Sequence, residues 1–338
     1  MNILNSLRQN NLSFKLVPIH IRELIYFQEV PCDIYGYVNE FFVVVMQKGL
    51  LINKDSLQQV INLGADQLFV LDDDYKLLVK KNQKILLEIS RSLSIGDVIA
   101  NGKKQVYYLS LNLEYLYQNP TDDETLLLQY QCIKSLGRLL LAKLSLIPVL
   151  FQYLLDQTYH YSVSQPLLSS LILLGYLKST QQFSEKDIIS LFLTSYFKDI
   201  GLSIIPKTCL DKKDLNEEEK KLISQHQQFS IEILSGRIPL GVNYFNIINN
   251  HHVHSLLGGD VVTKANDQNE VLIGAETLFV EMVDILAAMI SKRPYRDGLT
   301  LYSGLQRIKD ILGKEHQQEF KLLVWFLQKF FKLDDKSS

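Results

Sequence analysis

Short runs of β-branched and aromatic residues, bounded by turn residues, occupy the first part of the chain and predict strands. The runs are SFKLVPI (13–19), DIYGYV (33–38), FFVVVM (41–46) and DQLFVLD (66–72). Between the last two, KDSLQQVINLG (54–64) places Leu57, Val60 and Ile61 on one helical face, with Gly64 as a stop signal. Residues 13–115 therefore predict a mixed α/β region.

After YQNPTDD (117–123) the apolar positions follow a helical period only. Helices are predicted at 125–144, 185–200, 217–234, 271–291 and 317–332. Three of them follow capping pairs, which are Thr121 with Glu124, Ser184 with Asp187, and Asn216 with Glu219. Gly201 is well placed to end the second helix. We expect two domains, a small α/β domain of residues 1–117 and an all-α domain of residues 118–338.

Composition narrows the class of protein. The 338 residues are 47% hydrophobic and 21% charged, with a formal net charge of -2, an ordinary globular balance. This charge argues against a partner such as a nucleic acid polymer. It is still compatible with a local basic pocket for a small phosphate ligand. Cys32, Cys132 and Cys209 are far apart, so we expect reduced thiols in a cytoplasmic protein.

One uncharged stretch, YSVSQPLLSSLILLGYL (161–177), could be mistaken for a membrane span. Gln165, Pro166 and four serines interrupt it, and it is shorter than the roughly 20 apolar residues that a span requires. We expect a buried core helix and no membrane span. The N-terminus has neither the basic start nor the apolar run of a signal peptide.

The candidate chemistry lies in the helical half. Three of the seven histidines, His251, His252 and His254, fall within four positions. The possible ligands of a metal ion are His160, Asp199, His226, His251, His252 and Asp284. Such a mixture of imidazoles and carboxylates suits iron, manganese or zinc.

Adjacent side chains on a helix diverge by about 100°, so His251 and His252 are poorly placed to chelate one ion face-on. They could serve two ions roughly 3.5–4 Å apart, with Asp199 as a bridge, the spacing used for phosphoester hydrolysis. The alternative is that these are scattered surface or capping histidines, since no tight motif such as HExxH is present.

The order of the motifs resembles the HD-GYP family, bacterial metallophosphodiesterases of the HD superfamily that act on cyclic di-GMP. The matching stretches are YHYSVS, FKDIGLSIIPKTCLDKKDLNEEEKKLISQHQQFSIEIL, IINNHHVHSLLGGD and VEMVDILAAMISKRPYR, within roughly residues 150–313. The segments VPIHIREL, CDIYGYV and QKGLLI resemble the regulatory domain that precedes HD-GYP domains in some predatory bacteria. The resemblance implies an α/β regulatory or partner-binding domain followed by an all-α HD-GYP-like helical bundle.

The resemblance also implies the metal ligands. The family binds two, sometimes three, metals through residues that fall here on His160, Asp199, His226, His251, His252 and Asp284. We expect one or two divalent ions per chain, iron or manganese. One ion would use the last three histidines of this set with Asp199, and the other would use His160, Asp199 and Asp284. His254 lies outside the family pattern, as a loop histidine or an accessory ligand of a third ion.

Departures from the family pattern put catalysis in doubt. Lys198 replaces the histidine of the HD pair, and an ammonium has three donors but no lone pair. Leu202 replaces a phosphate-binding lysine, Val253 replaces a glutamate, and SLLGGD stands in place of the GYP signature. Arg293 and Arg296 survive in RPYR and could hold a phosphate. We hypothesise that Lys198 pairs with Asp284 or Asp199 and partly replaces the charge of one metal, so that catalysis would rest on Asp199 and Lys198.

Three functions stay open. The first is a degenerate HD-GYP protein of cyclic di-GMP signalling that binds metal, is hydrolytically impaired, and acts as a sensor or interaction module for signalling proteins. The second is an active metal-dependent cyclic di-GMP phosphodiesterase with an unusual dinuclear site. The third is a metal-free structural scaffold. Helical signalling domains of this kind often pair, so a homodimer is an open option.

Overall fold

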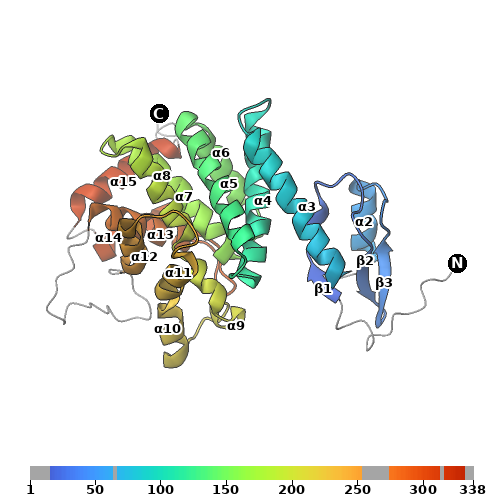
Figure 1. The fold of residues 1–338 in the computed structure, drawn as a ribbon. Helices are drawn as coiled ribbons and strands as arrows, with labels where there is room; N and C mark the ends of the chain where they lie inside the picture. Colours follow the sequence, from blue (N-terminus) through green and yellow to red (C-terminus); the bar gives the residue numbers. More distant parts are fainter. Residues whose placement is uncertain (1–15, 64–66, 253–273, 313–315, 332–338) are drawn as a thin grey trace, which may run out of the picture. The chain divides into compact units, whose positions relative to one another are not determined.

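The computed structural model describes residues 16–63, 67–252, 274–312 and 316–331 (Figure 1). The chain divides into two compact units, Met1–Ile85 and Leu86–Ser338. The strands belong to the first unit, and the regular elements described in the second are all helices. The mostly helical chain with a small N-terminal sheet is the predicted combination of elements.

The first unit is built on an antiparallel sheet of four strands in the order β1-β4-β2-β3. The strands are β1 (Leu16–Ile19), β2 (Ile34–Val38), β3 (Phe41–Met46) and β4 (Leu68–Leu71), and each falls within a predicted run. Asn39 and Glu40 join β2 to β3 with φ of 49° and 68°, the left-handed backbone of a tight hairpin. The short helices η1 (Ile21–Leu24) and α2 (Lys54–Asn62) complete this unit with the start of α3 (Asp72–Arg91).

The second unit is a bundle of helices. After α3 it contains α4 (Val98–Gln118), α5 (Asp123–Ala142), α6 (Leu146–Leu155), α7 (Tyr161–Thr180), α8 (Glu185–Phe197), η2 (Ile200–Ile204), α9 (Lys207–Leu210), α10 (Glu217–Ser224), α11 (His226–Leu234), α12 (Val242–Asn250), α13 (Ala275–Ile290), α14 (Leu301–Leu312) and α15 (Gln317–Phe330). Helix α7 lies in the middle of the bundle and packs against α6, α8 and α13 (Figure 1). Every residue from Tyr161 to Leu177 is buried, which confirms the predicted core helix. Among the described residues, no helix is both long and apolar enough to cross a membrane.

The predicted capping pairs have mixed outcomes. Ser184 caps α8 by accepting from the N–H of Asp187, and Asn216 forms a complete capping box with Glu219. The pair Thr121 with Glu124 is wrong by one position, because Asp122 is the cap of α5 and accepts from the N–H of Thr125. Gly64 lies outside the described residues.

The strands end at Leu71, so the later part of residues 13–115 is helical. Helix α4 packs on α5 and α6 within the second unit, and the compact units divide at Ile85–Leu86 within α3. The assignment of a regulatory domain to residues 1–117 and a metal-binding domain to 118–338 stays a prediction.

Gly201 does not end α8, as the sequence suggested, because α8 ends at Phe197 and Gly201 lies in η2. A Cβ at Gly201 would lie 2.1 Å from the carbonyl oxygen of His226 and 2.5 Å from the nitrogen of Ser230. Glycine is therefore required by the close approach of η2 to α11. The N–H of Gly201 donates to Ser230 Oγ (2.8 Å), and this hydroxyl donates to the Lys198 carbonyl (2.6 Å), which ties the end of α8 to α11.

Candidate metal centre

Three segments bring one aspartate and three histidines together. Asp199 precedes η2, His226 begins α11, and His251 and His252 follow α12. One ligand atom from each of these four residues lies within 4.8 Å of the others. These four are the predicted ligands of one metal ion, and the structure brings all of them to one place.

Backbone carbonyls fix the orientation of two of the imidazoles. The Nδ1–H of His226 donates to the Ile223 carbonyl (2.6 Å), and that of His251 donates to the Ile248 carbonyl (2.7 Å). Since a carbonyl can only accept, each Nδ1 carries a proton, which leaves Nε2 as the ring nitrogen able to face a metal ion. Such a bond to the other ring nitrogen is usual for histidines that bind metals.

The Nε2 atoms of both imidazoles face the same carboxylate oxygen. Oδ1 of Asp199 lies 3.1 Å from Nε2 of His251 and 3.4 Å from Nε2 of His226. Nε2 of His226 is buried and makes no hydrogen bond. A buried polar atom without a partner is costly. A divalent ion among these atoms would satisfy it, so the residues present fit a metal.

His252 adds a neutral imidazole. Its ring centroid lies 4.0 Å from that of His251 and 5.0 Å from that of His226. Desolvation of the ring and the repulsion of a further positive charge by His251 and His226 hold the pKa of His252 well below its ordinary value. A neutral imidazole is the form that binds metal ions.

Lys198 is fully buried beside the cluster. Its ammonium contacts Asp199 Oδ2 and lies 2.6 Å from Asp284 Oδ1. Burial alone would lower the pKa of Lys198, but the charges of Asp199 and Asp284 outweigh it, so the pKa is raised. The predicted pairing is present with both aspartates. A charged ammonium has no lone pair, so Lys198 is a counter-ion rather than a metal ligand.

Asp199 lies between the histidines and the Lys198 ammonium and contacts both. Burial would raise the pKa of its carboxyl group, but Lys198, His226 and His251 hold the pKa well below the ordinary value. The carboxylate is therefore ionised, with Oδ1 toward the histidines and Oδ2 toward the ammonium. The Tyr117 hydroxyl donates to the Asp199 carbonyl (3.2 Å) and helps to hold the backbone there.

The other two predicted metal ligands lie apart from this cluster. Asp284 is engaged by Lys198 and accepts from Gln165 Nε2 (2.9 Å). His160 caps α7, and its ring nitrogens lie 2.7 Å from Ser162 Oγ and 2.7 Å from Asp211 Oδ1. Both ring nitrogens of His160 thus already have hydrogen-bond partners. A metal site made of His160, Asp199 and Asp284 is therefore not preformed. His254 and Val253 lie outside the described residues.

A pocket of about 400 Å³ opens beside the cluster. Asp199, His226, His252 and Asp284 contribute to its wall, together with the predicted Arg293 and Arg296. This volume falls within the range of about 300–1,000 Å³ that is usual for small-molecule sites.

The two arginines have different roles. The Arg293 guanidinium stacks 3.7 Å from the centre of the Tyr161 ring and donates to Gln165 Oε1 (2.5 Å). Its Nε is buried without a hydrogen-bond partner, so Arg293 keeps a spare donor. The Arg296 guanidinium instead donates to carbonyls of Ala288, Met289 and Asp297 at the end of α13. Of the two predicted phosphate-binding residues, Arg293 has the better geometry.

Sequence reasoning missed several residues around the site. Gln165 links Arg293 to Asp284, and Asp211 holds His160. Arg307, from α14, also lines the pocket. No motif marks these positions, because their partners are more than fifty residues away or face the pocket only after the helices pack.

A helical bundle that gathers one aspartate and three histidines from separate segments indicates an HD-type metal-binding domain. Among solved structures, the chain is similar to Bd1817, a HDG"Y"P protein from Bdellovibrio bacteriovorus, with a TM-score of 0.63. The match has 14% sequence identity and covers 93% of this chain and 99% of that one. At this identity the likeness shows a shared HD-GYP-like fold. No protein-family model matches the sequence, and no curated protein matches it.

Proposed function

We propose that this chain is a metal-binding HD-GYP-like protein that recognises cyclic di-GMP or a related phosphate ligand as a sensor or interaction module, with impaired hydrolysis. The observation that carries the proposal is the buried Lys198 ammonium between Asp199 and Asp284, beside four residues that could hold one ion. The HD-GYP-like fold supports the choice of ligand class.

One divalent ion, iron or manganese, would be held by Asp199, His226, His251 and His252. A donor set of imidazole nitrogens with a carboxylate suits these metals. When bound, the ion would supply Lewis acidity toward a phosphate oxygen. Arg293, whose Nε is a spare buried donor on the pocket wall, would orient that phosphate group.

Efficient two-metal hydrolysis needs a second ion to stabilise the attacking and leaving oxygens. Lys198 pairs with both Asp199 and Asp284, and His160 is held by Ser162 and Asp211. An ammonium can balance charge, but it cannot lower the pKa of a water molecule as a bound metal does. The protein would therefore still bind the phosphate ligand but hydrolyse it poorly.

A slow but genuine phosphodiesterase is the second candidate, favoured by the complete four-residue cluster, since open metal sites can be catalytic. Product formation separates the two. Purified protein, reconstituted anaerobically with Fe(II) or Mn(II), is incubated with cyclic di-GMP beside a His251→Ala/His252→Ala control.

We expect bound metal and bound cyclic di-GMP without linear dinucleotide or GMP, and loss of metal in the control. Product that requires the intact histidines would instead establish the enzyme. A protein that binds neither metal nor nucleotide would be the structural scaffold.

A further inference from the structure

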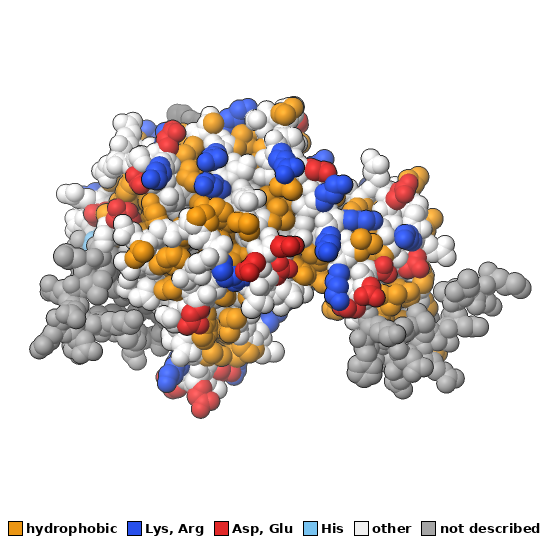
Figure 2. Space-filling view, viewed as in Figure 1, with side chains coloured by type: hydrophobic (Ala, Val, Ile, Leu, Met, Phe, Trp, Pro, Cys, Tyr) orange, Lys and Arg blue, Asp and Glu red, His pale blue; other side chains and the backbone are white. Residues whose placement is uncertain are grey.

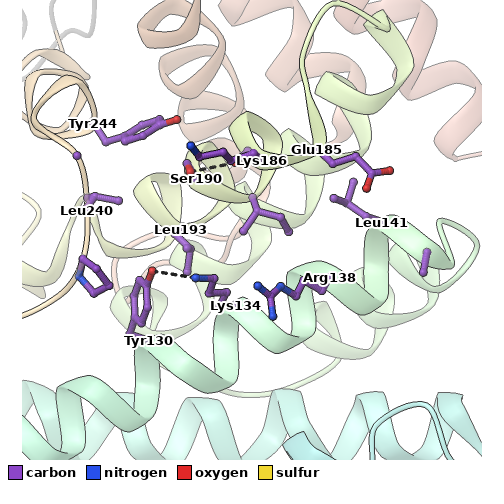
Figure 3. A pocket seen from close by; sticks show the side chains of 14 residues that line it. Tyr130, Lys134, Arg138, Leu141, Glu185, Lys186, Ser190, Leu193, Leu240 and Tyr244 are labelled. Carbon is purple, nitrogen blue, oxygen red and sulfur yellow. Dashed lines mark hydrogen bonds between the residues drawn. The ribbon is translucent and has the colours of Figure 1, made fainter.

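A second pocket, of about 530 Å³, lies in the helical unit between α5, α8 and the start of α12. It shares no lining residue with the pocket at the metal centre. Lys134 and Arg138 come from α5, and Lys186 comes from α8 (Figure 3). The space-filling view shows lysine and arginine side chains interspersed with hydrophobic and polar ones on the visible face (Figure 2).

The three cations have no acidic partner within the part of the chain that the structure describes. Among the described residues, no carboxylate lies within ion-pair distance of Lys134, Arg138 or Lys186. Glu185, the acidic residue of the lining, pairs with Lys178 outside the pocket (3.2 Å). The pocket wall therefore carries an unbalanced positive charge.

The placement of these cations is unfavourable for the helices that carry them. Lys134 and Arg138 are one turn apart on α5, where like charges repel. Lys186 lies in the first turn of α8, the positive end of the helix dipole. A bound anion would relieve both sources of repulsion, whereas folding gains nothing from them.

The remaining wall offers polar and aromatic groups. Tyr244 and Ser190 lie with Lys186 on one side of the pocket, and Tyr130 lies with Lys134 and Arg138 across from them (Figure 3). Lys134 Nζ contacts the Tyr130 hydroxyl (3.5 Å), which holds its ammonium at the pocket. Gly241, the uncapped start of α12, leaves the first N–H groups of that helix without a side-chain acceptor. Helix N-termini and convergent cations both favour phosphate groups.

We propose that this pocket is a second site, separate from the metal centre, for a small phosphate-bearing ligand of about mononucleotide size. Lys134, Arg138 and Lys186 bind the phosphate, and the Tyr244 ring offers a flat face to the remainder of the ligand. The pocket lies apart from the candidate metal ligands around Asp199, and in this proposal its occupant is an effector of the protein.

The test is calorimetric titration of the full chain with GMP and, separately, with inorganic pyrophosphate, in the presence of a chelator that removes metal from the centre. We expect binding that weakens at least ten-fold in Lys134→Gln/Arg138→Gln. Lys80→Gln/Lys309→Gln removes the same charge at exposed positions that do not line the pocket and should bind as the native chain does. Arg307→Gln, in the wall of the other pocket, should also leave binding unchanged.

Binding of GMP well above that of pyrophosphate would identify a nucleotide, and the reverse would identify a free polyphosphate. The proposal is overturned by absence of binding to the native chain. It also fails if the two charge-matched double variants weaken binding equally, or if Arg307→Gln abolishes it. Thermal unfolding checks that each variant folds, and the exposed Lys186→Gln repeats the test should the α5 variant be unstable.

Discussion

Lys198 and Asp284 face each other at 2.6 Å in the interior of the helical unit, with Asp199 as the second partner of the same ammonium. The carboxylates of Asp199 and Asp284 are both buried and both contact this ammonium, and without it they would repel each other strongly. The lysine therefore supplies the positive charge that a bound metal ion would supply in its place. It also occupies Asp284 Oδ1 and Asp199 Oδ2, two oxygens that a second ion would need, while Asp199 Oδ1 stays directed at the histidines.

Replacing Lys198 by histidine should raise the metal content of the protein. In Lys198→His the ammonium is lost, an imidazole lone pair is gained, and Asp199 and Asp284 become available as ligands. We expect the amount of bound Mn(II) to rise from about one ion per chain toward about two, the number used in dinuclear hydrolysis. Elemental analysis after anaerobic reconstitution measures it.

Lys198→Met is the matched control for that substitution, because it removes the charge at similar length without adding a ligand. Should Lys198→His bind no more metal than Lys198→Met, the lysine does not stand in place of an ion.

The same pair predicts a particular dependence of stability on pH. The depressed pKa of Asp199 contributes stability that is present above the ordinary value of 3.8 and lost as the pH falls through the lower folded value. The raised pKa of Lys198 contributes stability that is present below 10.5 and lost as the pH rises through the higher folded value. The ion pair should thus support the fold across the whole range between these limits.

Lys198→Met should reverse the acid side of that profile. Without the ammonium, burial and the neighbouring Asp284 raise the pKa of Asp199, so the variant should gain stability as the pH falls from 7 toward 5. The free energy of unfolding of the metal-free chain, measured by denaturant titration at several pH values, tests this. A variant with the same slope as the native chain would show that the pair is not coupled in this way.

The elements of the site that sequence reasoning found are those set by local chemistry. Asp199, His226, His251 and His252 were chosen by residue type and order, and the pairing of Lys198 followed from its lack of a lone pair. The hydrogen bond of His160 to Asp211 could not be predicted, because it joins residues 51 positions apart. The sequence pattern did not reveal the helix Val98–Gln118. Its buried tyrosines and leucines cover much of the helix surface, so the apolar positions do not mark one face.

Removing the His160 ring should leave metal binding at the cluster intact. His160→Ala breaks the bonds to Ser162 and Asp211 and removes the cap of α7, at a cost of about 1 kcal/mol in the free energy of unfolding. Bound Mn(II) should stay within error of the native value, whereas His226→Ala should lose most of it. Equal loss of metal in both variants would restore His160 as a ligand.

Gly201→Ala should damage the fold and the centre together. The added Cβ would meet backbone atoms of His226 and Ser230 in α11, which cannot rotate aside as a side chain can. We expect a loss of about 3 kcal/mol or more in the free energy of unfolding, at the upper end of overpacking effects. Since α11 carries His226, metal affinity should fall as well. The control is Gly102→Ala in α4, whose Cβ would meet only the flexible side chain of Leu150 (3.2 Å), and which should be nearly neutral. If Gly201→Ala matched this control in stability and metal content, the tight contact between η2 and α11 would not be what aligns Asp199 with His226.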